Sequence, residues 1–269
     1  MASTPDSEHT AVLVERRGPV TVVTLNRPDR ANAFDSTMLH ELNAAIARIA
    51  EDTRTKAVII TGAGRHFSSG ADLRESSAKR RAARLRYPHG VDLGRLCQPV
   101  IAAINGPALG GGCEIALSCD FRFIAADAVI GLTEILFGAL PTGGGTARLP
   151  GVVGLSWARK LIMTGEPVDA ALAARIGLVD QVAPPRAVLA SAERFARRLA
   201  RHPRWALRLA KSMLDGLSEP DLADALAIER EKVRTMATWE QWVAARAAAS
   251  ETMPAYARIF GGNPPSSLP

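Results

Sequence analysis

The chain has 269 residues, of which 47% are hydrophobic and 22% are charged, and its formal net charge is +6 at pH 7. This length supports a sizeable hydrophobic core, and the composition is that of a soluble globular protein rather than a disordered or fibrous one. No stretch reaches the roughly 18 consecutive apolar residues that a helix needs to span a bilayer.

The cysteines, the histidines and the first residues bear on location and on metals. Cys97, Cys113 and Cys119 form no CxxC pair, which argues against a disulfide framework and against a cysteine zinc site. The five histidines are scattered without metal-ligand spacing. Residues 1–8 contain acids and no apolar core, unlike a secretory signal or a transit peptide. We therefore expect a cytoplasmic protein without a membrane anchor or a metal site.

Basic residues concentrate in two segments, 79–86 and 194–211. In the second segment, arginines recur at steps of three and four, and Phe195, Leu199, Trp205 and Leu209 lie between them. This spacing predicts one amphipathic helix with a solvated basic face. The first segment has the charge to bind a polyanion, which leaves nucleic acid and a cofactor with several phosphates as alternatives.

The first part of the chain predicts a strand, a helix and a strand. Residues 20–25 are rich in Val and Thr and end at a turn-forming Asn-Arg-Pro, which is typical of a strand. Asp35 or Ser36 can then cap a helix, because the following apolar residues keep helical spacing. Those residues are Leu39, Leu42, Ile46 and Ile49. Residues 57–60 are an apolar run that ends in Thr-Gly-Ala-Gly, as a buried strand would.

The alternation of strands and helices continues to about residue 185, which predicts an α/β core. Further strands are expected at 100–104, 121–125 and 179–182, and helices at 113–117, 155–164 and 170–176. After residue 185 only helical patterns occur, up to about residue 261, with Trp239, Trp242 and Val243 on one helical face. The tail, 261–269, has the composition of a disordered segment.

A glycine-rich turn, residues 110–112, separates the expected strand at 100–104 from the expected helix at 113–117. Glycines let a backbone approach a ligand closely, and the start of a helix adds positive potential. The N–H of Gly111 is therefore our preferred donor to a developing oxyanion. Glu114 follows in an apolar setting, where burial would raise its pKa and suit it to proton transfer. The alternative is that Glu114 only favours a helix N-terminus electrostatically.

Two further segments complete the candidate site. Glu134 lies in an apolar stretch, and two glutamates that converge on one substrate would supply a general base and a general acid. Taken alone, Glu134 would more often be a structural acid. Residues 70–72 follow the strand at 57–60, and the N–H of Ala71 is a candidate second oxyanion donor. Asp72 is more typical of a side chain that caps a helix or ties down a loop.

Three segments together resemble the enoyl-CoA hydratase/isomerase (crotonase) family, most closely an enoyl-CoA hydratase. They are residues 67–73 (FSSGADL), 102–116 (AAINGPALGGGCEIA) and 134–149 (EILFGALPTGGGTARL), and their order and spacing also match. Asn26-Arg27-Pro28 with Asn32-Ala33, and elements within 161–182, extend the likeness over most of residues 12–185.

The resemblance implies a spiral of ββα units over residues 1–190, followed by a helical region, 191–269, that forms homotrimers or hexamers. It implies reversible addition of water to a trans-2-enoyl-CoA in fatty-acid or related acyl-CoA degradation, with coenzyme A entering only as part of the substrate. The N–H groups of Ala71 and Gly111 would polarise the thioester carbonyl. Glu114 would activate water for attack at the β-carbon, and Glu134 would exchange the proton at the α-carbon.

The resemblance also implies where coenzyme A binds. Its adenine and phosphates would lie along a loop and beside the glycine turn, where arginine is well suited to bind phosphate. The expected contacts are Arg30, Ser69, Ala71, Asp72, Arg74, Gly110 and Gly111.

Three departures from the family pattern leave alternatives open. Thr133 stands where many hydratases have proline, Thr142 stands where glycine is common, and residues 251–260 lack a Lys-Arg-x-Pro-x-Phe-like ending. Acyl-chain preference therefore stays open. An isomerase or another acyl-CoA reaction on this fold is one alternative. An RNA-binding or non-catalytic scaffold protein on this fold is the other, motivated by the basic segment 79–86.

Overall fold

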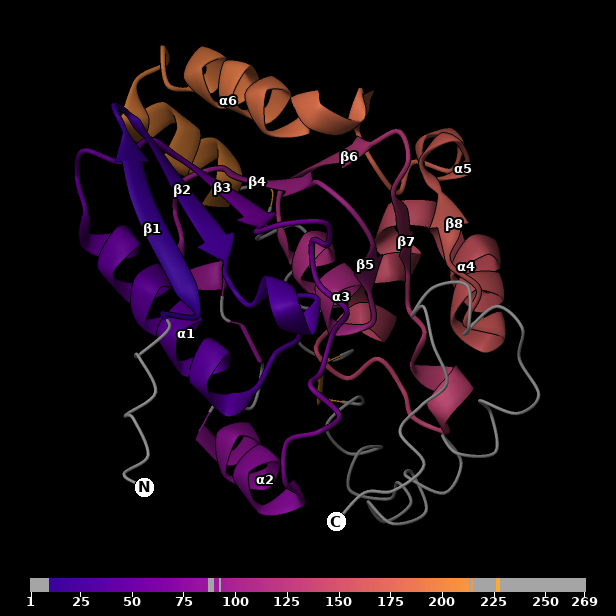
Figure 1. The fold of residues 1–269 in the computed structure, drawn as a ribbon. Coiled ribbons are helices and arrows are strands. Elements are labelled where there is room, and N and C mark those ends of the chain that lie inside the picture. The colour runs from indigo at the N-terminus through magenta and orange to yellow at the C-terminus, as the bar shows by residue number, and fades with distance from the viewer. Residues whose placement is uncertain (1–9, 87–89, 92, 213, 215–225, 228–269) are drawn as a thin grey trace, which may run out of the picture.

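The computed structural model describes residues 10–86, 90–91, 93–212, 214 and 226–227 (Figure 1). A six-stranded sheet in the order β1-β2-β3-β4-β6-β9 forms its centre. Only β1 is antiparallel to its neighbour; the other pairs are parallel. The strands are β1 (Val12–Arg17), β2 (Val20–Leu25), β3 (Ala57–Gly62), β4 (Val100–Ile104), β6 (Phe121–Ala125) and β9 (Gln181–Ala183).

Helices cover this sheet, as parallel strands require. Every residue of β4 is buried, and so are the first five residues of β3. α6 (Val188–Leu199) packs across β3, β4 and β6, and α1 (Ser36–Glu51) runs beside β1 (Figure 1). Asp35 caps α1, because its Oδ1 accepts a hydrogen bond from the N–H of Met38 at 2.8 Å. α2 (Ser77–Arg86) lies against α1.

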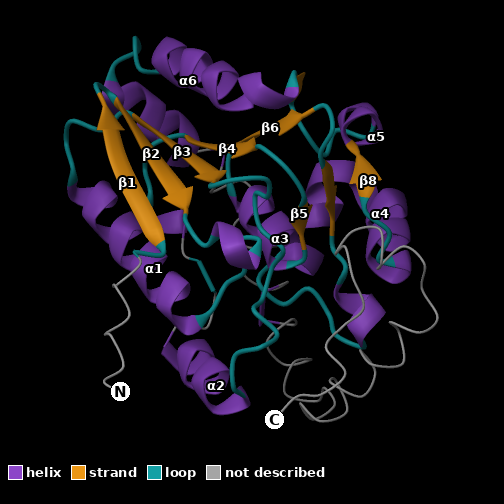
Figure 2. Ribbon diagram, viewed as in Figure 1, coloured by secondary structure: helices purple, strands orange, loops and turns teal. Residues whose placement is uncertain are grey.

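A second, three-stranded sheet, in the order β5-β7-β8, stands beside the first (Figure 2). It consists of β5 (Ala108–Leu109), β7 (Val129–Gly131) and β8 (Val168–Asp169). α3 (Gly111–Ser118) begins directly after β5, and a 3-10 turn, Glu134–Phe137, follows β7. The ends of two parallel strands thus bring these two segments to the same edge. α4 (Gly145–Thr164) and α5 (Ala170–Arg175) flank this sheet.

Most of the expected elements are confirmed. The strands expected at 20–25, 100–104 and 121–125 coincide with β2, β4 and β6, and the strand expected at 57–60 is the beginning of β3. The helix expected at 155–164 is the second half of α4. Gly154 interrupts α4 with a φ of 76° and a ψ of 158°, so the chain changes direction there. The first half of α4 was not predicted.

The strand expected at 179–182 is wrong by about two residues, because β9 begins at Gln181. The N–H groups of Leu178 and Val179 both bond to the carbonyl of Ala173, at 2.8 and 3.3 Å. These two residues therefore close the end of α5 and are not available to the sheet ladder.

The single amphipathic helix expected over 194–211 is also wrong. α6 ends at Leu199, and a new helix begins at Arg204, after Pro203. Proline has no N–H for the helical ladder and disfavours helical geometry in the residue before it. As a result, Trp205 and Leu209 do not continue the buried face of α6 and are 69% and 52% exposed.

α6 crosses the expected boundary between residues 190 and 191 and packs on the sheet. The described residues leave out most of the chain after residue 212. Trp239, Trp242 and residues 251–260 are among those left out. The division at residue 190 and the helical oligomerisation region therefore stay predictions. None of the helices in the described part of the chain has the length and apolar character that crossing a bilayer requires.

Candidate active site

The glycine turn at the start of α3 is pressed against the loop that contains Ser68. A Cβ built on Gly112 would lie 2.4 Å from the Ser68 carbonyl oxygen, so no side chain fits there. Gly110 has φ 52° and ψ −122°, a conformation that favours glycine, and its N–H donates to the carbonyl of Gly131 at 2.9 Å. Close packing of two backbones is thus the reason for glycine in this turn.

Two backbone amides from these loops are the candidate oxyanion donors. Phe34 pairs with Ala71: the Phe34 N–H donates to Gly70 O at 2.7 Å, and the Asp72 N–H donates to Phe34 O at 2.8 Å. The N–H of Ala71, between these two bonds, therefore points away from Phe34. A Cβ built on Gly111 would lie 3.8 Å from the nitrogen of Ala71. Within the described residues, no group accepts a hydrogen bond from either of these two N–H groups.

Glu114 is held by backbone amides from the start of α4. Its Oε1 accepts hydrogen bonds from the N–H of Gly143 at 2.7 Å and from the N–H of Gly145 at 3.0 Å. The residue is 9% exposed. These two hydrogen bonds fix the orientation of the carboxylate.

Glu134 also lies close to the glycine turn. It begins the 3-10 turn after β7, and its Oε1 lies 3.2 Å from the position that a Cβ on Gly110 would occupy. The hydroxyl of Thr133 lies 3.7 Å from the same position. A side chain at residue 110 would consequently displace the carboxylate, which is a second reason for glycine there.

The thiol of Cys113 lies close enough to both carboxylates for their charges to affect its pKa. Burial raises its pKa well above the usual range, and the negative charges of Glu134 and Glu114 raise the pKa further, against a smaller opposite effect of Arg122. Burial also raises the pKa of Cys119 to about 12. Both thiols therefore stay protonated near neutral pH, which excludes them as thiolate nucleophiles.

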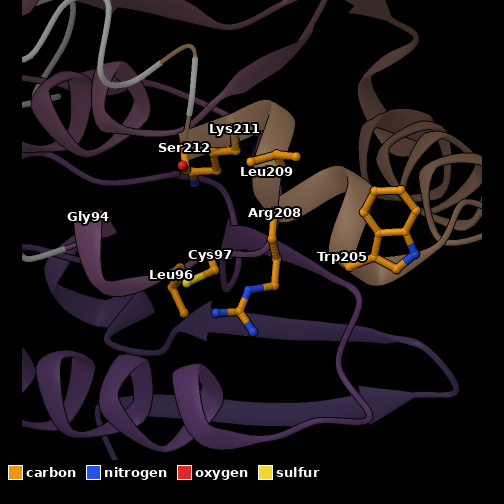
Figure 3. Close-up of a pocket in the computed structure, with 8 residues that line it drawn as sticks. All are labelled: Gly94, Leu96, Cys97, Trp205, Arg208, Leu209, Lys211 and Ser212. Atoms are coloured by element: carbon orange, nitrogen blue, oxygen red, sulfur yellow. The ribbon is translucent and has the colours of Figure 1, made fainter.

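The candidate site is distinct from the cavity shown in Figure 3, which has a volume of about 390 Å³. Cys97, Trp205 and Arg208 are among the residues that line this cavity. Cys97 precedes the first residue of β4, whereas Ala71 and Glu114 follow the last residues of β3 and β4. The cavity therefore lies at the opposite edge of the sheet. In the described part of the chain, no group of three or more His, Cys, Asp or Glu side chains is arranged to hold a metal ion.

Comparison with known proteins assigns the family. The model of the enoyl-CoA hydratase/isomerase family matches residues 15–253. The chain belongs to this family. It is 39% identical over 228 residues to the short-chain-enoyl-CoA hydratase of Clostridium acetobutylicum, which covers 82% of this chain and 87% of that protein. It is 40% identical over 232 residues to the 2,3-dehydroadipyl-CoA hydratase of Escherichia coli K12, with 85% and 91% covered.

A solved structure confirms the crotonase fold. The enoyl-CoA hydratase of Mycobacterium avium matches with a TM-score of 0.76 and 32% identity, over 84% of this chain and 96% of that one. The α/β class and the crotonase-like core expected from the sequence are thus confirmed.

The residues expected at coenzyme A lie on three segments of this crotonase fold: the turn with Arg30, the loop after β3 and the glycine turn at the start of α3. The N–H of Ser69 donates to the carbonyl of Ala31 at 3.0 Å, which holds the loop after β3 against the turn that contains Arg30. The side chains of Arg30 and Arg74 are exposed. The Asp72 carboxylate is 11% exposed, and it bonds to Arg27 and to the N–H of Arg74, both at 3.0 Å. This contact ties down the loop.

Three contributors to the site were missed in the sequence. Gly143 and Gly145 supply the amides that hold Glu114, and Arg27 bonds to Asp72. The glycine run at 143–145 was a visible signal, since consecutive glycines expose backbone N–H groups. Its partner, about 30 residues earlier, was not visible.

Gly143→Ala is expected to lower kcat for the family's reaction by about 10- to 100-fold, because its Cβ would lie 2.6 Å from Glu114 Oε2 and push the carboxylate aside. The matched control is Gly151→Ala in α4. A Cβ built on Gly151 would have no described atom within 4 Å outside its own stretch of helix. This control should leave kcat unchanged and raise the free energy of unfolding by about 0.5–1 kcal/mol. Steady-state rates and thermal unfolding of both variants test this. Equal kcat in the two variants would contradict the placement of Glu114.

Proposed function

We propose that this protein is an enoyl-CoA hydratase that adds water reversibly to a trans-2-enoyl-CoA and gives a 3-hydroxyacyl-CoA. The observation that carries the proposal is that Glu114 and Glu134 both lie at one glycine turn, beside the amides of Ala71 and Gly111. Hydration needs one group to take a proton from water and another to give a proton to carbon, and both carboxylates are retained. The names of the relatives carry the same activity.

The proposed reaction uses each group once. The Glu114 carboxylate takes a proton from water as the water oxygen bonds to the β-carbon. The electrons of the double bond move toward the thioester carbonyl, whose oxygen becomes an enolate held by the N–H groups of Ala71 and Gly111. Glu134, in its acid form for this step, then gives a proton to the α-carbon, and the neutral 3-hydroxyacyl thioester results. Proton exchange with water then returns Glu114 to its carboxylate form and Glu134 to its acid form.

Coenzyme A enters as part of the substrate, and the chain needs no other cofactor in this scheme. Arg30 and Arg74 are exposed on the turn and the loop that the Ser69–Ala31 hydrogen bond holds together, and their guanidinium groups are suited to the phosphates of coenzyme A. Relatives are named for short-chain, crotonyl and dehydroadipyl thioesters. We therefore propose a short acyl chain, either plain or ending in a carboxylate.

A panel of acyl-CoA esters tests the function and the chain length together. The panel holds trans-2-enoyl-CoA esters of four and eight carbons, one that ends in a carboxylate, and one trans-3-enoyl-CoA. Loss of enoyl-thioester absorbance, with a product heavier by one water, is the expected result for at least one trans-2 ester. If only the trans-3 ester reacts, to its trans-2 isomer, the protein is an isomerase. No turnover of any ester, together with salt-dependent RNA binding, would support the RNA-binding alternative.

Assembly and location are further parts of the proposal. We propose a homotrimer or a hexamer made of two trimers, supported by exposed apolar side chains at Leu155 and Met163 of α4, which are 55% and 73% exposed. Light scattering would contradict this if it gave the mass of one chain. We propose a cytoplasmic location because Cys97, Cys113 and Cys119 are all free thiols. Recovery of the native protein in a membrane or extracellular fraction would contradict it.

A further inference from the structure

Arg27, the residue after β2 and Asn26, binds three acceptors from two loops. Its Nη1 donates to the carbonyl of Ala33 at 2.6 Å. Its Nη2 lies 3.0 Å from Oδ2 of Asp35 and 3.0 Å from Oδ2 of Asp72. The side chains of this arginine and the two aspartates are 20%, 21% and 11% exposed, so water screens the contacts only in part. These three side chains are called the Arg27 clamp below.

The acceptors of the Arg27 clamp stand next to the backbone pairing that orients the Ala71 amide. Ala33 and Asp35 flank Phe34, and Asp72 follows Ala71; Phe34 and Ala71 are the two paired residues. The two bonds of this isolated bridge join the segments at Phe34 and Ala71, and bonds from the N–H of Ser69 to the carbonyl of Ala31 and from Ser36 to the carboxylate of Glu75 join them further along. The Arg27 clamp joins the same two segments through side chains, one residue away from the bridge on each.

The backbone of Arg27 is itself held in place by the side chain of Asn32. Its own N–H donates to Oδ1 of Asn32 at 2.9 Å, and Nδ2 of Asn32 donates to the carbonyls of Ala63 and His66 at 2.9 and 2.7 Å. Asn32 is fully buried and has a φ of 53°. These bonds hold the backbone of Arg27 in place, so its guanidinium can hold the two aspartates in position instead of moving with them.

We infer that Arg27 is a positioning residue for the oxyanion hole, because through Asp72 and Asp35 it fixes the direction of the Ala71 N–H. This inference rests on the proposed function, since it concerns the amide expected to hold the thioester oxygen. The guanidinium is needed for its shape as well as its charge, because it must reach three acceptors at once. Lysine supplies a compact point charge and cannot keep all three contacts.

The test uses the full chain and the variants Arg27→Gln, Arg27→Lys and Asp72→Asn. Release of the loop should move the Ala71 amide by a fraction of an ångström to an ångström, and errors of this size cost up to about 10²-fold in rate. Arg27→Gln is expected to lower kcat about 10- to 100-fold with KM changed less than about threefold. Arg27→Lys should recover only part of kcat. Asp72→Asn keeps the side-chain shape, which makes it the variant to use if the arginine variants do not fold, and it should lower kcat in the same direction.

Lys211→Gln is the matched control for loss of a partly buried ion pair. Lys211 lies 2.8 Å from Asp120, with side chains 13% and 25% exposed, and neither residue is part of the candidate site. The Lys211→Gln variant should lower the unfolding temperature about as much as Arg27→Gln does and leave kcat unchanged. A fall of kcat in both variants would show a general structural effect and overturn the inference.

A second readout separates this inference from the proposed function. Bound to the protein, a 3-oxoacyl-CoA would be partly in its enolate form, which absorbs in the near ultraviolet, and the enolate fraction reports on the oxyanion hole without turnover. We expect that fraction to fall about 10-fold in Arg27→Gln and to stay unchanged in Lys211→Gln. If wild type forms the enolate but hydrates no ester, the proposed function fails while the positioning role stands. An unchanged enolate fraction and kcat in Arg27→Gln would overturn the inference.

Discussion

Glu114→Gln and Glu134→Gln are each expected to lower kcat for hydration by about 10²-fold or more. Glutamine keeps the size of the side chain but neither accepts a proton from water nor gives one to carbon, and a lost acid or base usually costs about 10²- to 10⁴-fold. Oε1 of glutamine can still accept from the amides of Gly143 and Gly145, so the fold at Glu114 should persist. Steady-state kinetics with the best ester of the panel provides the measurement.

A control for this prediction is Glu41→Gln in α1. Glu41 accepts a hydrogen bond from the N–H of Val12 at 3.0 Å, so it is a structural glutamate that also binds a backbone amide. Its kcat should equal that of wild type within about twofold. Loss of activity in Glu41→Gln equal to that in the two site variants would show that the site variants act through stability rather than through proton transfer.

Gly70→Ala is expected to lower kcat by about 10²-fold or more without touching either glutamate. Gly70 has a φ of 87°, and a Cβ there would lie 2.9 Å from the nitrogen of Gly111 and 2.9 Å from the carbonyl oxygen of Leu109. Relief of this clash must separate the two loops that supply the Ala71 and Gly111 amides. Loss of one oxyanion donor typically costs about 10²- to 10³-fold in kcat.

Strain from the positive φ has to be separated from the clash in Gly70→Ala. Gly18, in the turn between β1 and β2, has a φ of 69°, and a Cβ there would meet no described atom closer than 3.7 Å. Gly18→Ala should therefore lose about 1 kcal/mol or more of unfolding free energy and keep its kcat. If Gly70→Ala loses stability to the same degree but retains wild-type kcat, the two amides do not form the oxyanion hole.

The sequence predicted elements best where a local signal decides them. β2, β4 and β6 coincide with apolar runs bounded by turn residues, and Asp35 caps α1 as expected. Predictions from the sequence failed where a hydrogen bond to a neighbouring turn replaces the expected bond to the sheet. Leu178 and Val179 are the example, because their N–H groups bond to the carbonyl of Ala173. The break at Pro203 was a local signal as well, but the regular spacing of arginines outweighed it in the prediction.

In the candidate site, too, the individual residues could be predicted from local segments, but their contacts with distant segments could not. Glu114, Gly111, Glu134 and Ala71 could be proposed from the sequence because each lies in a short segment whose residue types suit the chemistry. Their mutual arrangement depends on contacts between distant segments, such as Gly143 with Glu114 and Arg27 with Asp72. Such contacts leave no periodic pattern in one sequence. Arg27 was therefore seen only as part of a turn motif, and Asp72 was seen without its partner.

The most direct test of the central claim is single-turnover hydration in H₂¹⁸O by wild type, Glu114→Gln, Glu134→Gln and the double variant, with enzyme in excess over ester. We predict that wild type places ¹⁸O at the β-carbon, and that each single variant does so at least about 10²-fold more slowly. The double variant should be little slower than the slower single variant, because both groups serve one addition. A rate within about threefold of wild type in either single variant would contradict the account.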